Sequence, residues 1–263
     1  MSIKKRIIIK IGSNILTTAS GKLDINQINN IVTQCSEAIA LYPQLSFLIV
    51  TSGAITCGSE ALAMDAVFIP EKQAAAAVGQ IQLMNTYLQA FSSYKHHIAQ
   101  ILLTKEGLSH HVYRRNIKTT LETLEDKEVI PILNENDSVA TDEIGERFGD
   151  NDELSGLVAE LFSASTLMLL SDKDGLFTKH PDHEGAELLK KVPRIDDAIL
   201  ALADDRDLSR RNRGGMSAKL NCAQYCSQRG IDVHLVNGRK TNIILDVLAG
   251  KDVGTFFPKQ EIY

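Results

Sequence analysis

Two lysines stand in segments of this sequence that are well suited to bind a phosphate group. Lys10 lies in the apolar run Ile7–Ile11, just before a Gly-Ser turn, and Lys219 ends the segment Arg213-Gly214-Gly215-Met216-Ser217-Ala218-Lys219. A glycine pair that leads into a helix offers backbone N–H groups and the positive end of the helix dipole to an anion. Two ammonium groups beside such backbone can stabilise a phosphoryl group while its charge moves from one oxygen to another. The pattern predicts phosphoryl-transfer chemistry if folding brings both lysines into one cleft.

Lys10 is the most informative single residue of the pattern. Its isoleucine neighbours predict a strand buried on both faces, where an unpaired ammonium group costs several kcal/mol. A lysine in such a strand therefore needs a carboxylate partner or an anionic ligand. The sequence leaves one alternative open, namely an edge strand from which Lys10 reaches into water.

The pair Gly214-Gly215 can form a phosphate-binding turn, but it can equally be an ordinary turn that begins a helix. It is not a GxxxxGK[ST] loop, and no GxGxxG follows the first apolar run, which disfavours the common dinucleotide-binding motif. The arginines before it add positive charge, although such a run is most often a solvated surface.

Small and polar residues follow several of the expected strands. In open parallel sheets, ligands bind beyond the carboxyl ends of the strands. Each of these segments alone is typical of a turn, but together they predict a site at one edge of the sheet. The segments are Gly12-Ser13-Asn14, Ser52-Gly53-Ala54, Asn134-Glu135-Asn136-Asp137 and Ser171-Asp172. The segment Gly149-Asp150-Asn151-Asp152 precedes a predicted helix. Asp152 can cap the start of this helix, or it can orient the two lysines.

The elements that position these residues alternate between short β-rich runs and longer helical patterns. We expect strands at 7–11, 47–50, 98–103, 129–133, 167–170 and 233–236, and helices at 24–41, 71–92, 113–124, 153–162, 216–229 and 243–248. This rhythm predicts a mostly parallel sheet with helices on both faces. We interpret 1–263 as a single domain with two lobes that meet near residue 160. Segment 139–152 is expected to be a functional loop, and 173–213 a hairpin with a mobile flap.

The composition is that of a globular protein. The 263 residues are 44% hydrophobic and 23% charged, with a net charge of −5. An acidic chain with 5% aromatic residues and no Trp disfavours nucleic-acid binding. The four cysteines lack metal-site spacing and indicate a reducing compartment. No apolar run approaches the length of a membrane span or signal peptide, so we expect a soluble cytoplasmic protein.

Six segments, taken in order, resemble the glutamate-phosphorylating branch of the amino acid kinase family. They cover nearly the whole chain, and their combination is specific although no single segment is. The segments are Lys10–Ser13, Val50–Ile55, Gln73–Gln80, Asn134–Asp137, Gly149–Asp152 and Gly214–Lys219.

The resemblance implies a three-layer αβα sandwich around a mainly parallel sheet of roughly eight strands, as in carbamate kinase. It implies transfer of the ATP γ-phosphoryl group to the side-chain carboxylate of L-glutamate, the first step of proline synthesis. By position, the catalytic residues are Lys10, Lys219 and Asp152. Glutamate would contact Ser52, Gly53, Ala54, Asn134, Asp137 and Asn151, all in the first lobe. ATP, arriving with Mg²⁺, would contact Lys10, Gly12, Ser13, Ser171, Asp172, Arg213, Gly214, Gly215, Met216, Ser217, Ala218 and Lys219, mostly in the second lobe, and no residue is assigned as a direct metal ligand.

The resemblance also implies a homodimer or homotetramer, proline as feedback inhibitor, and glutamyl phosphate reductase as a partner. Many family members carry a C-terminal PUA domain, and for this sequence, which ends at Tyr263, we expect the form that lacks it. Two alternatives stay open. The acceptor could be acetylglutamate, aspartate, carbamate or a nucleoside monophosphate, or the chain could be a nucleotide or amino-acid sensor without catalysis.

Overall fold

A single sheet organises the chain. The computed structural model describes residues 4–139, 151–204 and 215–261. Within them the strands are β1 (Lys5–Ile11), β2 (Leu45–Val50), β3 (Ile98–Leu103), β4 (Ile130–Glu135), β5 (Thr166–Ser171), β6 (Asp232–Asn237) and β7 (Thr255–Phe257). They pair in the order β3-β4-β2-β1-β5-β6-β7, and every pair is parallel except β6 with β7. The described part of the sheet thus has seven strands, against the roughly eight expected.

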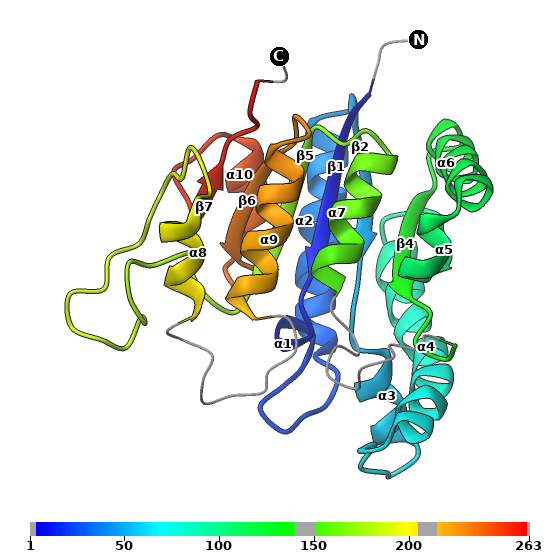
Figure 1. Cartoon of the computed structure of the whole chain (residues 1–263). Coiled ribbons are helices and arrows are strands. Elements are labelled where there is room, and N and C mark those ends of the chain that lie inside the picture. The colour runs from blue at the N-terminus through cyan, green and yellow to red at the C-terminus, as the bar shows by residue number, and fades with distance from the viewer. Residues whose placement is uncertain (1–3, 140–150, 205–214, 262–263) are drawn as a thin grey trace.

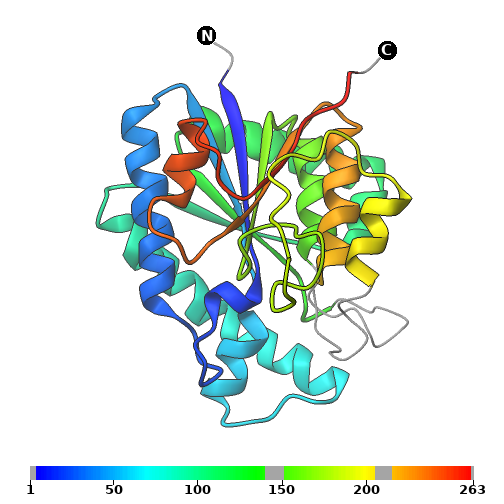
Figure 2. The ribbon, with the colours of Figure 1, turned by 90° about the vertical axis from the view of Figure 1, so that its left-hand side faces the viewer.

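Helices cover both faces of the sheet and give the expected three layers (Figures 1 and 2). One core contains residues of α1 (Ser13–Leu16), α2 (Ile25–Leu41), α3 (Ala54–Ala61), α4 (Ile69–Ser92) and α10 (Ile243–Leu248). The other core contains residues of α5 (Lys105–Ser109), α6 (His111–Asp126), α7 (Asn151–Leu161), α8 (Asp197–Asp204) and α9 (Met216–Ser227). In Figure 2 the strands lie between α2 and α10 on one side and α9 on the other.

The central strand β1 explains this arrangement. Successive side chains of a strand point to opposite faces, and the isoleucines of β1 are fully buried on both. Ile7 and Ile9 belong to the core beneath α2, whereas Ile8 belongs to the core beneath α7 and α9. Lys10 shares the face of Ile8, so its side chain leaves the sheet towards α7 and α9.

Helices α3 and α4 extend past the carboxyl edge of the sheet and pack tightly on each other (Figure 1). The packing requires glycine at two positions. A Cβ on Gly79 would lie 1.9 Å from the carbonyl oxygen of Ala54, and one on Gly58 would lie 1.7 Å from that of Ala75. Because those atoms are backbone, no side-chain rotation can make room. The two glycines therefore place α4 directly against the segment that follows β2.

The elements expected from the sequence are all present, with ends shifted by a few residues. Helix α4 begins two residues early because Pro70 occupies its first turn and the Glu71 carboxylate accepts hydrogen bonds from Val67 and Phe68 N–H. The sequence reading missed β7 and the short helices α1, α3, α5 and α8. The hairpin expected after residue 173 is supported by an antiparallel bridge between Phe177 and Leu188. The rest of the expected flap falls partly on α8 and partly on 205–214, outside the described residues.

Candidate active site

Lys10 lies in the middle of the sheet. Strand β1 is paired on both sides, and Lys10 lies opposite Val50 of β2 and Leu169 of β5. The residue is only 3% exposed. The edge-strand alternative is therefore wrong, since an edge position would leave one side of β1 unpaired. A buried ammonium group at this place needs a counter-charge.

Asp152 supplies the counter-charge for Lys10 and for a second lysine. It lies in the first turn of α7 and is fully buried. Its Oδ1 is 2.5 Å from Lys10 Nζ, and its Oδ2 is 3.1 Å from Lys219 Nζ. Lys219, 8% exposed, lies in the first turn of α9, which packs beside α7. Both lysines thus meet at one carboxylate, which is the convergence that the sequence pattern required.

The electrostatic balance of this cluster favours an anion. Burial by itself raises the pKa of the Asp152 carboxyl, but the nearby charges and hydrogen bonds of Lys10 and Lys219 outweigh it, so its pKa is lowered. The carboxylate is therefore ionised at neutral pH and offsets one of the two positive charges. The amino ends of α7 and α9 add the positive ends of two helix dipoles. A phosphate group fits this excess of positive charge.

A chain of three side-chain amides lies next to Asp152. Asn151 Nδ2 donates to the Thr51 carbonyl oxygen at 2.5 Å, to Asn134 Oδ1 at 2.8 Å and to Ser52 Oγ at 3.2 Å. Asn134 Nδ2 in turn donates to Gln80 Oε1 at 2.9 Å. All three amide residues are buried. The chain brings together the predicted substrate residues Ser52, Asn134 and Asn151, which come from three separate parts of the sequence.

A cavity of about 260 Å³ opens at the Gln80 end of this chain. Its lining includes Ala54 and Asp137, both predicted to bind substrate, together with Glu135, Gln80 and Gln100. Gly53 precedes Ala54 with a φ of 99°, in the left-handed region that glycine favours, and allows the sharp turn into α3. The cavity thus combines amide groups and carboxylates with apolar walls, as sites for small polar molecules do.

The other predicted site residues lie along the same edge. A Cβ built on Gly12 would be 3.9 Å from Lys10 Nζ and 3.3 Å from the Leu170 carbonyl oxygen, so the backbone here stays close to the ammonium group. Ser13 begins α1 after β1, and Ser171 ends β5 before Asp172. Gly215 precedes α9, and Met216, Ser217 and Ala218 form its first turn. Arg213 and Gly214 lie outside the described residues.

The sequence analysis assigned no individual role in the site to Gln80, Gln100 or Glu135, although Gln80 and Glu135 lie in segments that it singled out. Gln80 did carry a signal in the sequence. It occupies the buried face of α4 together with Ala76, Leu83 and Tyr87, at helical spacing. A glutamine among apolar residues on such a face must find hydrogen-bond partners, which makes it a candidate for a site. Glu135 was marked only by its place in the segment Asn134–Asp137, and Gln100 gave no signal, because its role depends on which strands become neighbours.

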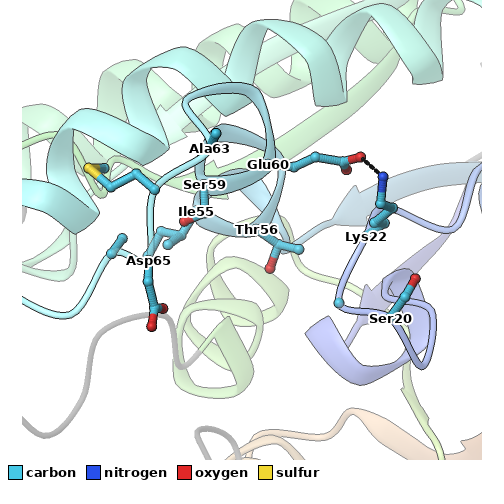
Figure 3. Close-up of a pocket in the computed structure, with 11 residues that line it drawn as sticks. Ser20, Lys22, Ile55, Thr56, Ser59, Glu60, Ala63 and Asp65 are labelled. Atoms are coloured by element: carbon cyan, nitrogen blue, oxygen red, sulfur yellow. Dashed lines mark ion pairs between the residues drawn. The ribbon is translucent and has the colours of Figure 1, made fainter.

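A second cavity, of about 540 Å³, lies between the loop after α1 and helix α3 (Figure 3). Lys22 and Glu60 form an ion pair of 2.9 Å beside it, and both side chains are more than 40% exposed. No predicted site residue is among the described residues that line it. It is therefore a surface hollow next to the site and contributes nothing to the lysine cluster.

The described residues offer no dedicated cage for a metal ion, since no three His, Cys, Asp or Glu side chains gather at one place within them. Magnesium commonly keeps several waters and binds through substrate phosphates with one or two carboxylates, so this edge can accept it together with a nucleotide. In the same part of the chain, no helix is long and apolar enough to cross a bilayer.

Sequence comparisons agree with this geometry. The model of the amino acid kinase family matches residues 5–237. A glutamate 5-kinase of Clostridium perfringens is 39% identical over 258 residues, which cover 96% of this chain and 95% of that protein. A glutamate 5-kinase of Salmonella arizonae is 41% identical over 263 residues, which cover 99% of this chain and 70% of that protein.

Solved structures share the fold at low sequence identity. A carbamate kinase from Giardia lamblia bound to AMP-PNP has a TM-score of 0.68 at 16% identity, over 99% of this chain and all of that one. A UMP kinase from Ureaplasma parvum has a TM-score of 0.63 at 19% identity, over 97% of this chain and 99% of that one. The expected carbamate kinase-like sandwich is confirmed. The family model matches residues 5–237, and the two relatives named glutamate 5-kinase are 39–41% identical over nearly the whole chain, so the chain belongs to the amino acid kinase family.

Proposed function

We propose that this chain is a glutamate 5-kinase, which uses ATP to phosphorylate the side-chain carboxylate of L-glutamate in the first step of proline synthesis. One observation supports the chemistry above all others: Lys10 and Lys219 meet at the buried carboxylate of Asp152. The choice of substrate follows the relatives, which carry that name at 39–41% identity over nearly the whole chain.

Lys10 and Lys219 act directly on the transferring phosphoryl group. The acceptor carboxylate has an ordinary pKa near 4.3, so it is ionised at neutral pH and needs no general base. The difficulty is that an anion must approach the polyanionic end of ATP. Two buried ammonium groups reduce this repulsion and stabilise the charge of the transition state. Asp152 is a positioning residue, because it holds both lysines in the same place.

The amide chain and the adjoining cavity bind glutamate. Asp137 and Glu135 line the cavity with carboxylates that suit the substrate α-ammonium group. Asn151 Oδ1 is buried and accepts no hydrogen bond from any described residue, so it can accept one from the substrate. Ala54 lines the cavity, and Ser52 and Gly53 precede it where β2 turns into α3. All these residues precede or begin α7, which supports a glutamate-binding lobe of about 1–160.

The lobe of about 161–263 holds ATP. Ser171 and Asp172 lie at the end of β5, and Gly215–Lys219 lie at the start of α9. Arg213 and Gly214, which are outside the described residues, complete the proposed set of ATP contacts. Gly12 and Ser13 lie next to Lys10 and complete the phosphate end of the nucleotide site. When bound together with ATP, Mg²⁺ would neutralise part of the charge on the phosphates.

Three further expectations belong to the proposal. The outward face of α4 carries Ile81 and Leu88, which are 74% and 49% exposed, and supports self-association through this helix. Proline inhibits the reaction, and the product passes to glutamyl phosphate reductase, as the family implies. Light scattering checks the first expectation, and proline titration of the activity checks the second. The third is checked by whether adding the reductase raises flux at a fixed kinase concentration.

The decisive assay couples ADP release to hydroxamate formation. With ATP, Mg²⁺, glutamate and hydroxylamine, an acyl phosphate is trapped as the hydroxamate. We expect ADP and hydroxamate in equal amounts with glutamate, and far less with acetylglutamate, aspartate, carbamate or UMP. Preference for another acceptor refutes the substrate assignment. ATP binding without ADP release for every acceptor supports a sensor and refutes catalysis.

A further inference from the structure

The amide chain from Asn151 to Gln80 has a fixed direction. The oxygen and the nitrogen of a side-chain amide can be told apart where the amide contacts a backbone group. A backbone N–H only donates, so it must face the oxygen, and a backbone carbonyl only accepts, so it must face the nitrogen. Glu135 N–H donates to Asn134 Oδ1 at 3.0 Å, which fixes the Asn134 oxygen and leaves its Nδ2 as the donor to Gln80. At the far end, the Thr51 carbonyl fixes Asn151 Nδ2 in the same way.

The direction of the hydrogen bonds in the amide chain determines which atom of Gln80 can bind a ligand. Because Asn134 Nδ2 is a donor, the Gln80 atom that it meets must be the oxygen Oε1. The Gln80 nitrogen Nε2 is then left over, and it is buried without a hydrogen-bond partner among the described residues. A buried donor without a partner destabilises the fold, so its presence needs an explanation. Gln80 itself is 92% buried and lines the 260 Å³ cavity.

The backbone fixes the place of this donor. Gln80 follows Gly79, whose missing Cβ lets α4 approach Ala54 more closely than any other residue would allow. Ala54 and Gln80 line the same cavity, together with Glu135 and Asp137. The N–H donor therefore lies in a wall that otherwise carries two acceptor carboxylates. A ligand with both an ammonium group and a carboxylate matches that mixture.

We infer that Gln80 is a specificity residue, whose Nε2–H donates to the α-carboxylate of the amino-acid substrate. The inference rests on the proposed phosphorylation of glutamate. It assigns the α-carboxylate and not the side-chain carboxylate, because the latter must reach Lys10 and Lys219 to accept the phosphoryl group. Asn134 acts through Gln80 and keeps the donor pointed in one direction.

The test uses two ligands and the variant Gln80→Glu. L-glutamate carries the α-carboxylate, and its α-amide, L-isoglutamine, carries a neutral group of similar shape. At pH 8 the new carboxylate in Gln80→Glu accepts hydrogen bonds, so it repels an α-carboxylate and tolerates an α-amide. We expect the KM for glutamate in the hydroxamate assay to rise by about 10–100-fold. The inhibition constant of isoglutamine should change by less than threefold, and the KM for ATP should stay as in the wild type.

A merely structural role for Gln80 would weaken both ligands equally, so the ratio of the two constants is the deciding quantity. Gln82→Glu is the matched control, because it makes the same change on the exposed side of the same helix. The second variant, Gln80→Met, removes the donor without adding charge. It should raise the glutamate KM about tenfold and decides the matter if thermal unfolding shows that Gln80→Glu is not folded.

The possible outcomes separate the inference from the proposed function. Wild-type protein that forms no hydroxamate with glutamate refutes the function itself. If the wild type is active but the folded variants keep the same ratio of the glutamate KM to the isoglutamine inhibition constant, only the assignment of Gln80 is refuted. Equal affinity of the wild type for both ligands also overturns it, since the site then does not distinguish an α-carboxylate.

Discussion

Replacing Asp152 by Asn tests the lysine cluster most directly. The substitution keeps the shape of the side chain but removes its negative charge. Lys10 and Lys219, 3% and 8% exposed, then face each other as two buried cations around a neutral amide. The change therefore converts one surplus positive charge into two, in a place that water barely reaches.

The expected cost is large compared with total protein stability. Removing one partner of a buried ion pair costs about 3–5 kcal/mol, because the remaining charge is left uncompensated. For a chain of this size, each kcal/mol shifts the melting temperature by about 2–4 °C. Asp152→Asn should thus melt about 6–20 °C below the wild type. Its kcat should fall by about 10²–10³-fold, because both lysines lose the group that positions them.

The pH dependence of stability gives an independent measurement. The pKa of Asp152 is lowered in the folded chain, so its stabilising effect is fully present above the ordinary aspartate pKa of about 3.9. The effect disappears as the pH falls through the lowered folded-state pKa. Urea unfolding of wild type and variant should therefore differ by a constant amount between pH 5 and 8, and the difference should shrink below pH 4.

Glu153→Gln is the matched control for this experiment. Glu153 is the next residue and pairs with Lys105 at 3.0 Å, but its side chain is 58% exposed. Exposed ion pairs contribute about 0–1 kcal/mol, so this variant should melt within a few degrees of the wild type. If Asp152→Asn shows wild-type stability and wild-type kcat, the two lysines do not depend on Asp152, and our account of the site is wrong.

Three further substitutions probe the rest of the site. Lys219→Ala should lower kcat by about 10²–10³-fold in the ADP assay, and wild-type turnover would remove Lys219 from the mechanism. Asp137→Ala should raise the KM for glutamate at least tenfold and leave ATP affinity, measured by calorimetry, nearly unchanged; an unaltered glutamate KM would show that Asp137 is not a ligand. Gly79→Ala should destabilise the chain by at least about 1–3 kcal/mol in urea, because its methyl group meets the Ala54 carbonyl oxygen, whereas Ala74→Gly on the exposed face of α4 should cost no more than about 1 kcal/mol. Equal stability of Gly79→Ala and wild type would contradict the tight α3–α4 packing.

The sequence predicted the main strands and helices because each has a strong local pattern. The isoleucine run of β1 and the periodic apolar residues of α2 predict a strand and a helix without knowledge of the segments that pack on them. Short elements escaped detection for the opposite reason. Helix α1 has four residues and β7 has three, too few for a period to appear, and they are stabilised by the cores on which they pack.

The kinds of groups at the site were likewise determined by the sequence. A lysine within an apolar strand and a second one after a glycine pair already indicated a bound anion. Their distance in the chain meant that only folding could decide whether they meet. They do so because β1 lies at the centre of the sheet and because α7 and α9 pack side by side on the face to which Lys10 points.

Tertiary structure decided which group the Gln80 amide meets. Sequence showed a glutamine on an apolar helix face, but it could not show which end of that amide would be left without a partner. That choice depends on Asn134, whose amide is oriented by the N–H of the next residue of β4, Glu135, and which meets Gln80 of α4 only in the folded chain. Composition and local periodicity therefore determined which chemical groups this protein has, whereas their geometry came from backbone contacts between segments distant in sequence, which no local pattern encodes.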